Sequence, residues 1–301
     1  MAEALNSRRE RVMTNALNVL MTDLIEYGGL FPSAGQAMPE AIRHYAEYLG
    51  DEEGNWLGRF LVPVGRLKEF QEEHARAFPE GGAQPWRLAV QAGLDLRADL
   101  ASIAAFDPHG AVIDSIDIRV TGREEIVPAL EQVPGSLMAY FEIGIRSDLE
   151  PMLARLGYFG GRAKVCIGGV DGEVPASASE LARFLTACAR HRIGFKVAAG
   201  YHQPFSAVPA GEGAGGKHSH GFLNLLLAAA CARDGADREE IEVLLREGPQ
   251  GFDFSYDAVK WRERRLNCVQ LQQARTRFAI SYACSSLRKP IRVLQGMGLL
   301  D

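Results

Sequence analysis

The sequence predicts a single-domain (β/α)8 barrel, and three observations support this prediction. Apolar runs of strand length alternate with helix-like segments from residue 57 onwards. These runs are rich in Val, Ile, Phe and Ala without strict polar alternation, which is typical of parallel strands covered on both faces. Eight such runs fit into the 301 residues, a length at which α/β barrels form one unit. A doubly wound open parallel sheet is the alternative.

The elements follow one another in a regular order. Amphipathic helices at 9–26 and 38–49 open the chain, and residues 1–50 are expected to form a helical addition in front of the barrel. The predicted strands cover residues 57–63, 86–92, 111–120, 137–145, 162–168, 193–200, the FDFSY run (252–256) and 277–286. The predicted helices between and after them cover residues 64–77, 95–105, 123–132, 147–157, 176–191, 220–233, 237–247 and 289–299. Ser177 or Ser179, followed by Glu180, predicts a capped start for the helix over 176–191.

Composition narrows the functional classes. A net charge of −5 predicts no basic face for nucleic acid, and the most apolar stretch, GFLNLLLAAACA, is too short to span a bilayer. No secretory signal is recognisable, and the five cysteines show no CxxC spacing, so we expect reduced thiols in a cytoplasmic protein. A homo-oligomer is compatible with the sequence. The expected partner is a small molecule.

Three successive predicted strands carry a charged residue at similar depth: Glu142, Lys164 and Lys196. A cation is costly to bury without a partner, and barrel enzymes take their catalytic groups from strand ends. A structural ion pair between Glu142 and Lys164 on neighbouring strands is the simplest alternative. We nevertheless expect a functional role for at least one of the two lysines.

Two buried lysines indicate a specific chemistry. A lysine that is desolvated or close to another cation has a lowered pKa, and its neutral amine can attack a carbonyl group to form a Schiff base. Glu142 and His202, just past the strand of Lys196, are the acid/base candidates. The sequence therefore predicts an aldolase-like lyase that acts on a small anionic carbonyl compound and needs no cofactor.

Several further residues are predicted to bind the substrate. Arg59 and Arg119 would hold its anionic end through paired hydrogen bonds. Gln91 lies near a strand end, Asn224 lies one turn into a helix, and Lys217 lies in a glycine-rich stretch, where it could contact a phosphate or carboxylate group.

The spacing around the lysines carries a resemblance. K-x-x-x-G at 164–168 and F-K-x-x-x-G at 195–200 resemble class I aldolases of the deoxyribose-phosphate aldolase type over about residues 160–200. The resemblance implies a barrel in which Lys164 forms the Schiff base and Lys196 lowers its pKa. Gly168, Gly169 and Gly200 partly match the phosphate-site glycines of that family. The lysines fall on the fifth and sixth predicted strands, one earlier than in that family.

The whole chain is also similar to a group of uncharacterised bacterial barrel proteins. The stretch GLFPSA at 29–34 and the stretches KVCIGG and FKVAAGYHQP carry this similarity. It implies no reaction.

Two other functions remain open. His202, His218 and His220 with Glu142 could bind a divalent metal ion, which would make the protein a metal-dependent lyase, isomerase or hydrolase. Alternatively, the strand charges could be structural pairs in a barrel that serves as a binding or scaffold module.

Overall fold

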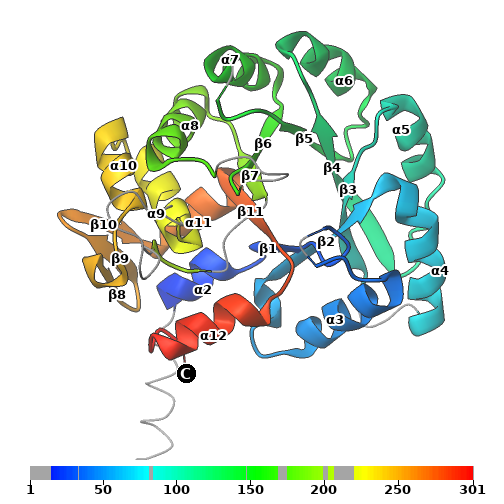
Figure 1. Ribbon diagram of the computed structural model, residues 1–301, viewed down its shortest axis with the longest axis horizontal. Helices are drawn as coiled ribbons and strands as arrows, with labels where there is room; N and C mark the ends of the chain where they lie inside the picture. The colour runs from blue at the N-terminus through cyan, green and yellow to red at the C-terminus, as the bar shows by residue number, and fades with distance from the viewer. Residues whose placement is uncertain are drawn as a thin grey trace, which may run out of the picture.

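The computed structural model describes residues 15–32, 34–80, 84–146, 148–168, 175–198, 203–206 and 220–300. Eight parallel strands close into a barrel, with helices around its outside (Figure 1). The barrel strands are β1 (Ile25–Tyr27), β2 (Leu57–Pro63), β3 (Trp86–Gln91), β4 (Ala111–Arg119), β5 (Met138–Glu142), β6 (Arg162–Cys166), β7 (Phe195–Ala198) and β11 (Ala279–Cys284). β1 pairs with both β2 and β11, so the barrel is closed and the doubly wound alternative is wrong.

The first barrel strand lies where the sequence predicted the end of a helix. The helix α2 covers only Asn15–Met21 of the described residues, and the three residues of β1 follow it. The next helix along the chain is α3 (Met38–Gly50), which has a proline in its first turn and completes a β/α unit with β1. Residues 25–50 are therefore the first β/α unit of the barrel and not an addition to it, which corrects the prediction for residues 1–50. The extra strand also places Lys164 and Lys196 on the sixth and seventh barrel strands along the chain.

The FDFSY run does not contribute a barrel strand. It forms β8 (Phe252–Phe254), which joins β9 (Ala258–Trp261) and β10 (Arg264–Asn267) in a separate antiparallel sheet. The ring of Phe252 stacks on Phe205 at a centroid distance of 5.4 Å. Hydrophobic contact with this neighbour, rather than with the barrel, explains the apolar character of the run. The sequence also missed α11 (Cys268–Arg277), which follows β10.

The other predicted helices are confirmed with small shifts of their ends. They are α4 (Leu67–Ala77), α5 (Leu96–Ala104), α6 (Ile126–Gln132), α7 (Leu149–Phe159), α8 (Ala178–His191), α9 (Phe222–Arg233), α10 (Arg238–Leu245) and α12 (Arg288–Gly296). The capping box of α8 forms as predicted, between Ser177 and Glu180. Within the described chain, no helix is long and apolar enough to cross a membrane. None of the five cysteines, all of which lie among the described residues, forms a disulfide bond.

Strand periodicity determines what lies inside the barrel. Successive side chains of a strand point to opposite faces, so residues two apart share a face. In β4 the buried Ile116 and Ile118 alternate with Ser115 and Asp117, and in β2 the buried Phe60 follows Arg59 and contacts Phe70 of α4. The apolar set therefore packs against the surrounding helices. The polar set faces the barrel axis.

Candidate functional site

The inside of this barrel is unusually polar. Barrel interiors are usually filled by branched aliphatic side chains. Here the inward-facing set includes carboxylates, cations and hydroxyl groups contributed by seven of the eight strands: Glu26, Arg59, Ser115, Asp117, Tyr140, Glu142, Lys164, Lys196 and Ser281. Most of these side chains are almost inaccessible to solvent, so each charge needs a close partner.

Asp117 joins the two lysines. Lys164 and Lys196 are register partners on β6 and β7, so they lie side by side in the sheet. The Nζ atom of Lys164 lies 3.1 Å from Oδ2 of Asp117, and that of Lys196 lies 2.6 Å from Oδ1. One buried carboxylate on β4 thus binds both ammonium groups from across the barrel. The position of Asp117 between the lysines was not predicted.

Towards the carboxyl ends of the strands, the contacts continue to the surface. The Nζ atom of Lys164 lies 2.9 Å from Oε2 of Glu142, and Arg119 binds Oε1 of Glu142 at 2.9 Å. Exposure of the side chain rises from 10% at Lys164 to 71% at Arg119. The ion pair between Glu142 and Lys164, one of the two alternatives raised by the sequence, is confirmed. It does not exclude a catalytic role, because Lys164 is the lysine nearer to solvent.

Towards the amino ends of the strands, Lys196 binds a second carboxylate. Its Nζ atom lies 3.1 Å from Oε2 of Glu26 and 4.3 Å from the ring centroid of Tyr140. Ser281 donates a hydrogen bond of 2.9 Å to Oε1 of Glu26. Sequence reasoning missed Glu26, because it lies at the centre of the three-residue strand that was predicted as part of a helix.

A further run of ion pairs leads from Glu26 to the amino ends of the strands. Arg59 lies 3.7 Å from Glu26 and donates two hydrogen bonds to Asp114. Arg87 binds the same carboxylate at 3.1 Å and lies 3.7 Å from Asp23. Charges of alternating sign therefore connect the two ends of the barrel. We call this set the ion chain, and it consists of Arg119, Glu142, Lys164, Asp117, Lys196, Glu26, Arg59, Asp114, Arg87 and Asp23.

The ion chain shifts the pKa of its central groups. Burial alone would lower the pKa of Lys164, but the carboxylates of Asp117 and Glu142 outweigh burial and raise it. Burial alone would raise the pKa of Asp117 and of Glu142, but the neighbouring cations outweigh it and lower both values. The expectation of a lowered pKa at Lys164 is therefore wrong, because two carboxylates contact this amine and stabilise its charged form.

The structure does not bring the two predicted anion-binding arginines together. Arg119 ends β4 at the carboxyl end of the barrel, whereas Arg59 lies with Arg87 and Asp23 near the strand starts. Gln91 ends β3 in register with Asp117, which places it near Arg119. Asn224 is fully buried away from this region, where its amide nitrogen donates to the carbonyl groups of Leu244 and Glu247. It is a structural residue.

Several other predicted residues lie outside the described residues: His202, His218, Gly169, Gly200 and Lys217. Gly168 follows β6 and accepts a weak hydrogen bond from the thiol of Cys166. One ring nitrogen of His220 lies 2.9 Å from the carbonyl oxygen of Ala176. The part of the chain that the structure describes contains no cluster of three metal-ligand side chains.

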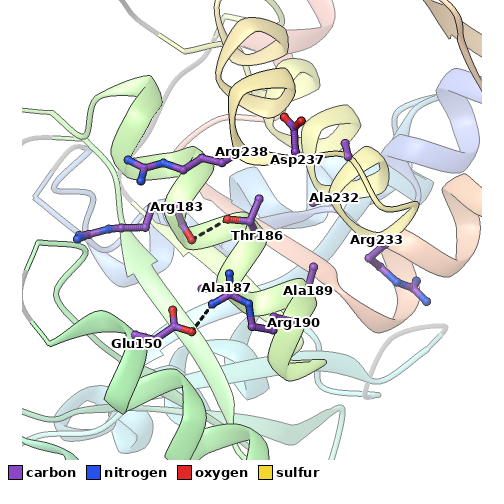
Figure 2. A pocket seen from close by; sticks show the side chains of 11 residues that line it. Glu150, Arg183, Thr186, Ala187, Ala189, Arg190, Ala232, Arg233, Asp237 and Arg238 are labelled. Atoms are coloured by element: carbon purple, nitrogen blue, oxygen red, sulfur yellow. Dashed lines mark hydrogen bonds and ion pairs between the residues drawn. The ribbon is translucent and has the colours of Figure 1, made fainter.

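A surface hollow of about 610 Å³ lies outside the barrel, between α7, α8, α9 and α10 (Figure 2). Alanines form part of its wall, and Arg183, Arg190, Arg233 and Arg238 contribute side chains to it. Arg190 binds Glu150 at 2.6 Å across the hollow. None of the residues predicted for catalysis or substrate binding lines it. We therefore place the candidate site inside the barrel, around Lys164.

No protein family, curated protein or solved structure matches this chain. The function is therefore inferred from the geometry of the barrel interior.

Proposed function

We propose that the protein is an aldolase-like lyase that binds a small anionic carbonyl compound as a Schiff base on Lys164. The observation that supports this most is the position of the Lys164 amine between the carboxylates of Asp117 and Glu142, at 3.1 and 2.9 Å. It is the more accessible of the two buried amines, and it lies towards the end of the barrel where barrel enzymes carry out their chemistry.

The two carboxylates suit the product of Schiff-base formation. An ammonium group and a protonated Schiff base carry the same single positive charge at nearly the same place. The surroundings that raise the pKa of Lys164 therefore also stabilise the iminium ion. An iminium ion withdraws electrons from the neighbouring carbon, which is what breaking or making a carbon–carbon bond requires.

The amine must lose a proton before it attacks. Glu142 contacts Lys164 and is partly exposed, so it is the better placed carboxylate to take that proton. The amine then adds to the carbonyl carbon, a second proton moves from its nitrogen to the carbonyl oxygen, and the resulting hydroxyl group leaves as water when the first proton returns from Glu142. A double bond between nitrogen and carbon replaces the carbonyl bond, and the positive charge of the original ammonium group is again on nitrogen once water has left.

Lys196 would act through Asp117 and not as a nucleophile. It is more deeply buried than Lys164 and is held by Glu26 and Asp117 together. Its charge keeps Asp117 ionised, and an ionised Asp117 stabilises the iminium ion on Lys164. Arg119 and Gln91, at the carboxyl ends of their strands, would bind the anionic group of the substrate.

Reductive trapping tests the proposal. The protein is incubated at neutral pH with pyruvate or with acetaldehyde, in the presence of cyanoborohydride, and each lysine is read by peptide mass spectrometry. Lys68, whose side chain is 91% exposed, is the internal reference for unspecific alkylation. We expect modification of Lys164 in the wild type to saturate as the concentration of the carbonyl compound rises, because the compound binds in the barrel before it reacts, whereas modification of Lys68 should rise in proportion to that concentration.

The opposite result has a clear meaning. If Lys68 is modified and Lys164 is not, the Schiff-base proposal fails. That result would favour the non-catalytic alternative. One observation already supports this alternative: each buried lysine is paired with two carboxylates. In that case the ion chain would be a structural core of a binding or scaffold barrel.

A further inference from the structure

A cavity of about 330 Å³ opens at the amino ends of the barrel strands, opposite to the proposed reaction site. Its wall includes residues at or near the starts of four strands, among them Arg87, Met138, Arg162 and Ile280. The N-terminal face of a barrel usually contributes to stability and not to ligand binding. Its volume is close to the lower limit of small-molecule sites.

Four arginines line this cavity: Arg59, Arg87, Arg162 and Arg275. The first two are compensated, since both bind Asp114 and Arg87 also approaches Asp23. The other two are not compensated by any carboxylate within ion-pair distance among the residues that the structure describes. The cavity wall therefore carries an excess of two positive charges.

The two uncompensated arginines are held in place by other contacts. The Arg162 guanidinium lies over the ring of Tyr140, 5.7 Å from its centroid. Arg275 is buried and donates hydrogen bonds to the carbonyl oxygens of Leu20, Thr22, Ala279 and Ile280. A guanidinium has five N–H groups, so one of those of Arg275 is not used by these four bonds.

A third observation comes from Tyr140. Its side chain is fully buried and lines the cavity, yet its hydroxyl group has no hydrogen-bond partner in the described part of the chain. Buried polar groups are nearly always satisfied, and an exception points to a missing partner. A ligand with acceptor oxygens would accept this hydrogen bond and neutralise the arginines at the same time.

We propose that this cavity is a binding site for a small organic dianion, held through a phosphate or carboxylate group. Arginine binds either group with paired hydrogen bonds. Arg162 and the free N–H group of Arg275 would bind the anionic oxygens, and the Tyr140 hydroxyl would donate a third bond. Apolar side chains in the wall, such as Met138 and Ile280, suit the carbon part of the ligand. This site is independent of the Schiff base on Lys164.

Calorimetric titration of the full chain tests the proposal, with inorganic phosphate and succinate as separate probes. We expect saturable binding at a ratio of one to one for at least one of them, and the preferred probe distinguishes a phosphate ligand from a carboxylate ligand. Arg162→Gln should weaken binding about tenfold or more, the effect of losing one charge-assisted hydrogen bond. Arg123→Gln is the matched control, because Arg123 is exposed on another part of the surface and should leave affinity unchanged.

Two results would overturn the proposal. One is that the wild type binds neither probe in a saturable way. The other is equal affinity in the wild type and in Arg162→Gln. Should Arg162→Gln not fold, Tyr140→Phe takes its place, since it removes only the hydroxyl group and keeps the ring; unchanged affinity in that variant would equally refute the site.

Discussion

Replacing Lys196 by methionine should destabilise the protein strongly, because it leaves two buried carboxylates without their shared cation. Lys196 contacts Glu26 at 3.1 Å and Asp117 at 2.6 Å, and all three side chains are almost completely buried. Removing one partner of a buried ion pair costs about 3–5 kcal/mol. Methionine keeps most of the side-chain volume, so lost packing contributes little.

The size of the effect can be expressed as a melting temperature. An unfolding entropy of about 2.1 cal/mol/K per residue corresponds to roughly 0.6 kcal/mol/K for this chain. A loss of about 3–5 kcal/mol therefore lowers Tm by roughly 5–8 °C. The assay is thermal and urea unfolding followed by circular dichroism.

Two companion variants separate charge from packing. Lys164→Met should cost less than Lys196→Met, because Glu142 is partly exposed and still binds Arg119. The double variant Lys196→Met with Glu26→Gln should regain part of the loss, because one of the two carboxylates that lost Lys196 becomes neutral. The reasoning is refuted if Lys196→Met unfolds at the same urea concentration as the wild type, or if the double variant is no more stable than Lys196→Met.

Three further predictions concern stability at acid pH, the reactivity of Lys164 and the capping of α8. The neighbouring cations lower the pKa of Asp117 below its ordinary value of 3.8, so the ionised carboxylate contributes its full stabilisation above pH 3.8 and loses it as the pH falls through the pKa of the folded state. Urea unfolding between about pH 2 and 6 should show this loss of stability. The Asp117→Asn variant should show a weaker dependence of stability on pH. At about pH 8–10, acetic anhydride should acylate Lys164 far more slowly than Lys68, as measured by peptide mass spectrometry. The carboxylates raise the pKa of Lys164 and keep its amine protonated, and acylation would remove the charge that they stabilise. Ser177→Ala should cost about 1 kcal/mol of unfolding free energy in urea, through loss of the capping box with Glu180.

Each of these has a result that would contradict it. An Asp117→Asn variant with an unchanged acid profile would show that this carboxylate is not paired as described. Acylation of Lys164 at the rate of Lys68 would mean that the amine is largely neutral and accessible. Wild-type stability of Ser177→Ala would mean that other contacts hold the start of α8.

Much of the fold could be predicted from the order of the apolar runs. Six predicted strands, from 57–63 to 193–200, coincide with β2 to β7 to within a few residues, because each is a long apolar run bounded by turns. The strand β1 could not be recognised, since three residues carry no periodic signal and its hydrogen bonds come from β2 and β11. The FDF strand was assigned to the barrel because periodicity shows that a segment is a strand without showing which sheet it joins.

For the candidate site, the sequence by itself determined which charged residues lie on barrel strands, and Glu142, Lys164 and Lys196 were found in this way. Only the tertiary structure decided what they contact. Glu26 reaches Lys196 from a strand near the start of the chain, Ser281 donates to Glu26 from a strand near its end, and Asp117 reaches both lysines from across the barrel. The position of a side chain along the barrel axis depends on the register of its strand. For this reason Arg59 lies near the amino ends of the strands and Arg119 at their carboxyl ends. The physical reason is that a pKa depends on distances between charges, and these distances exist only once the barrel has closed.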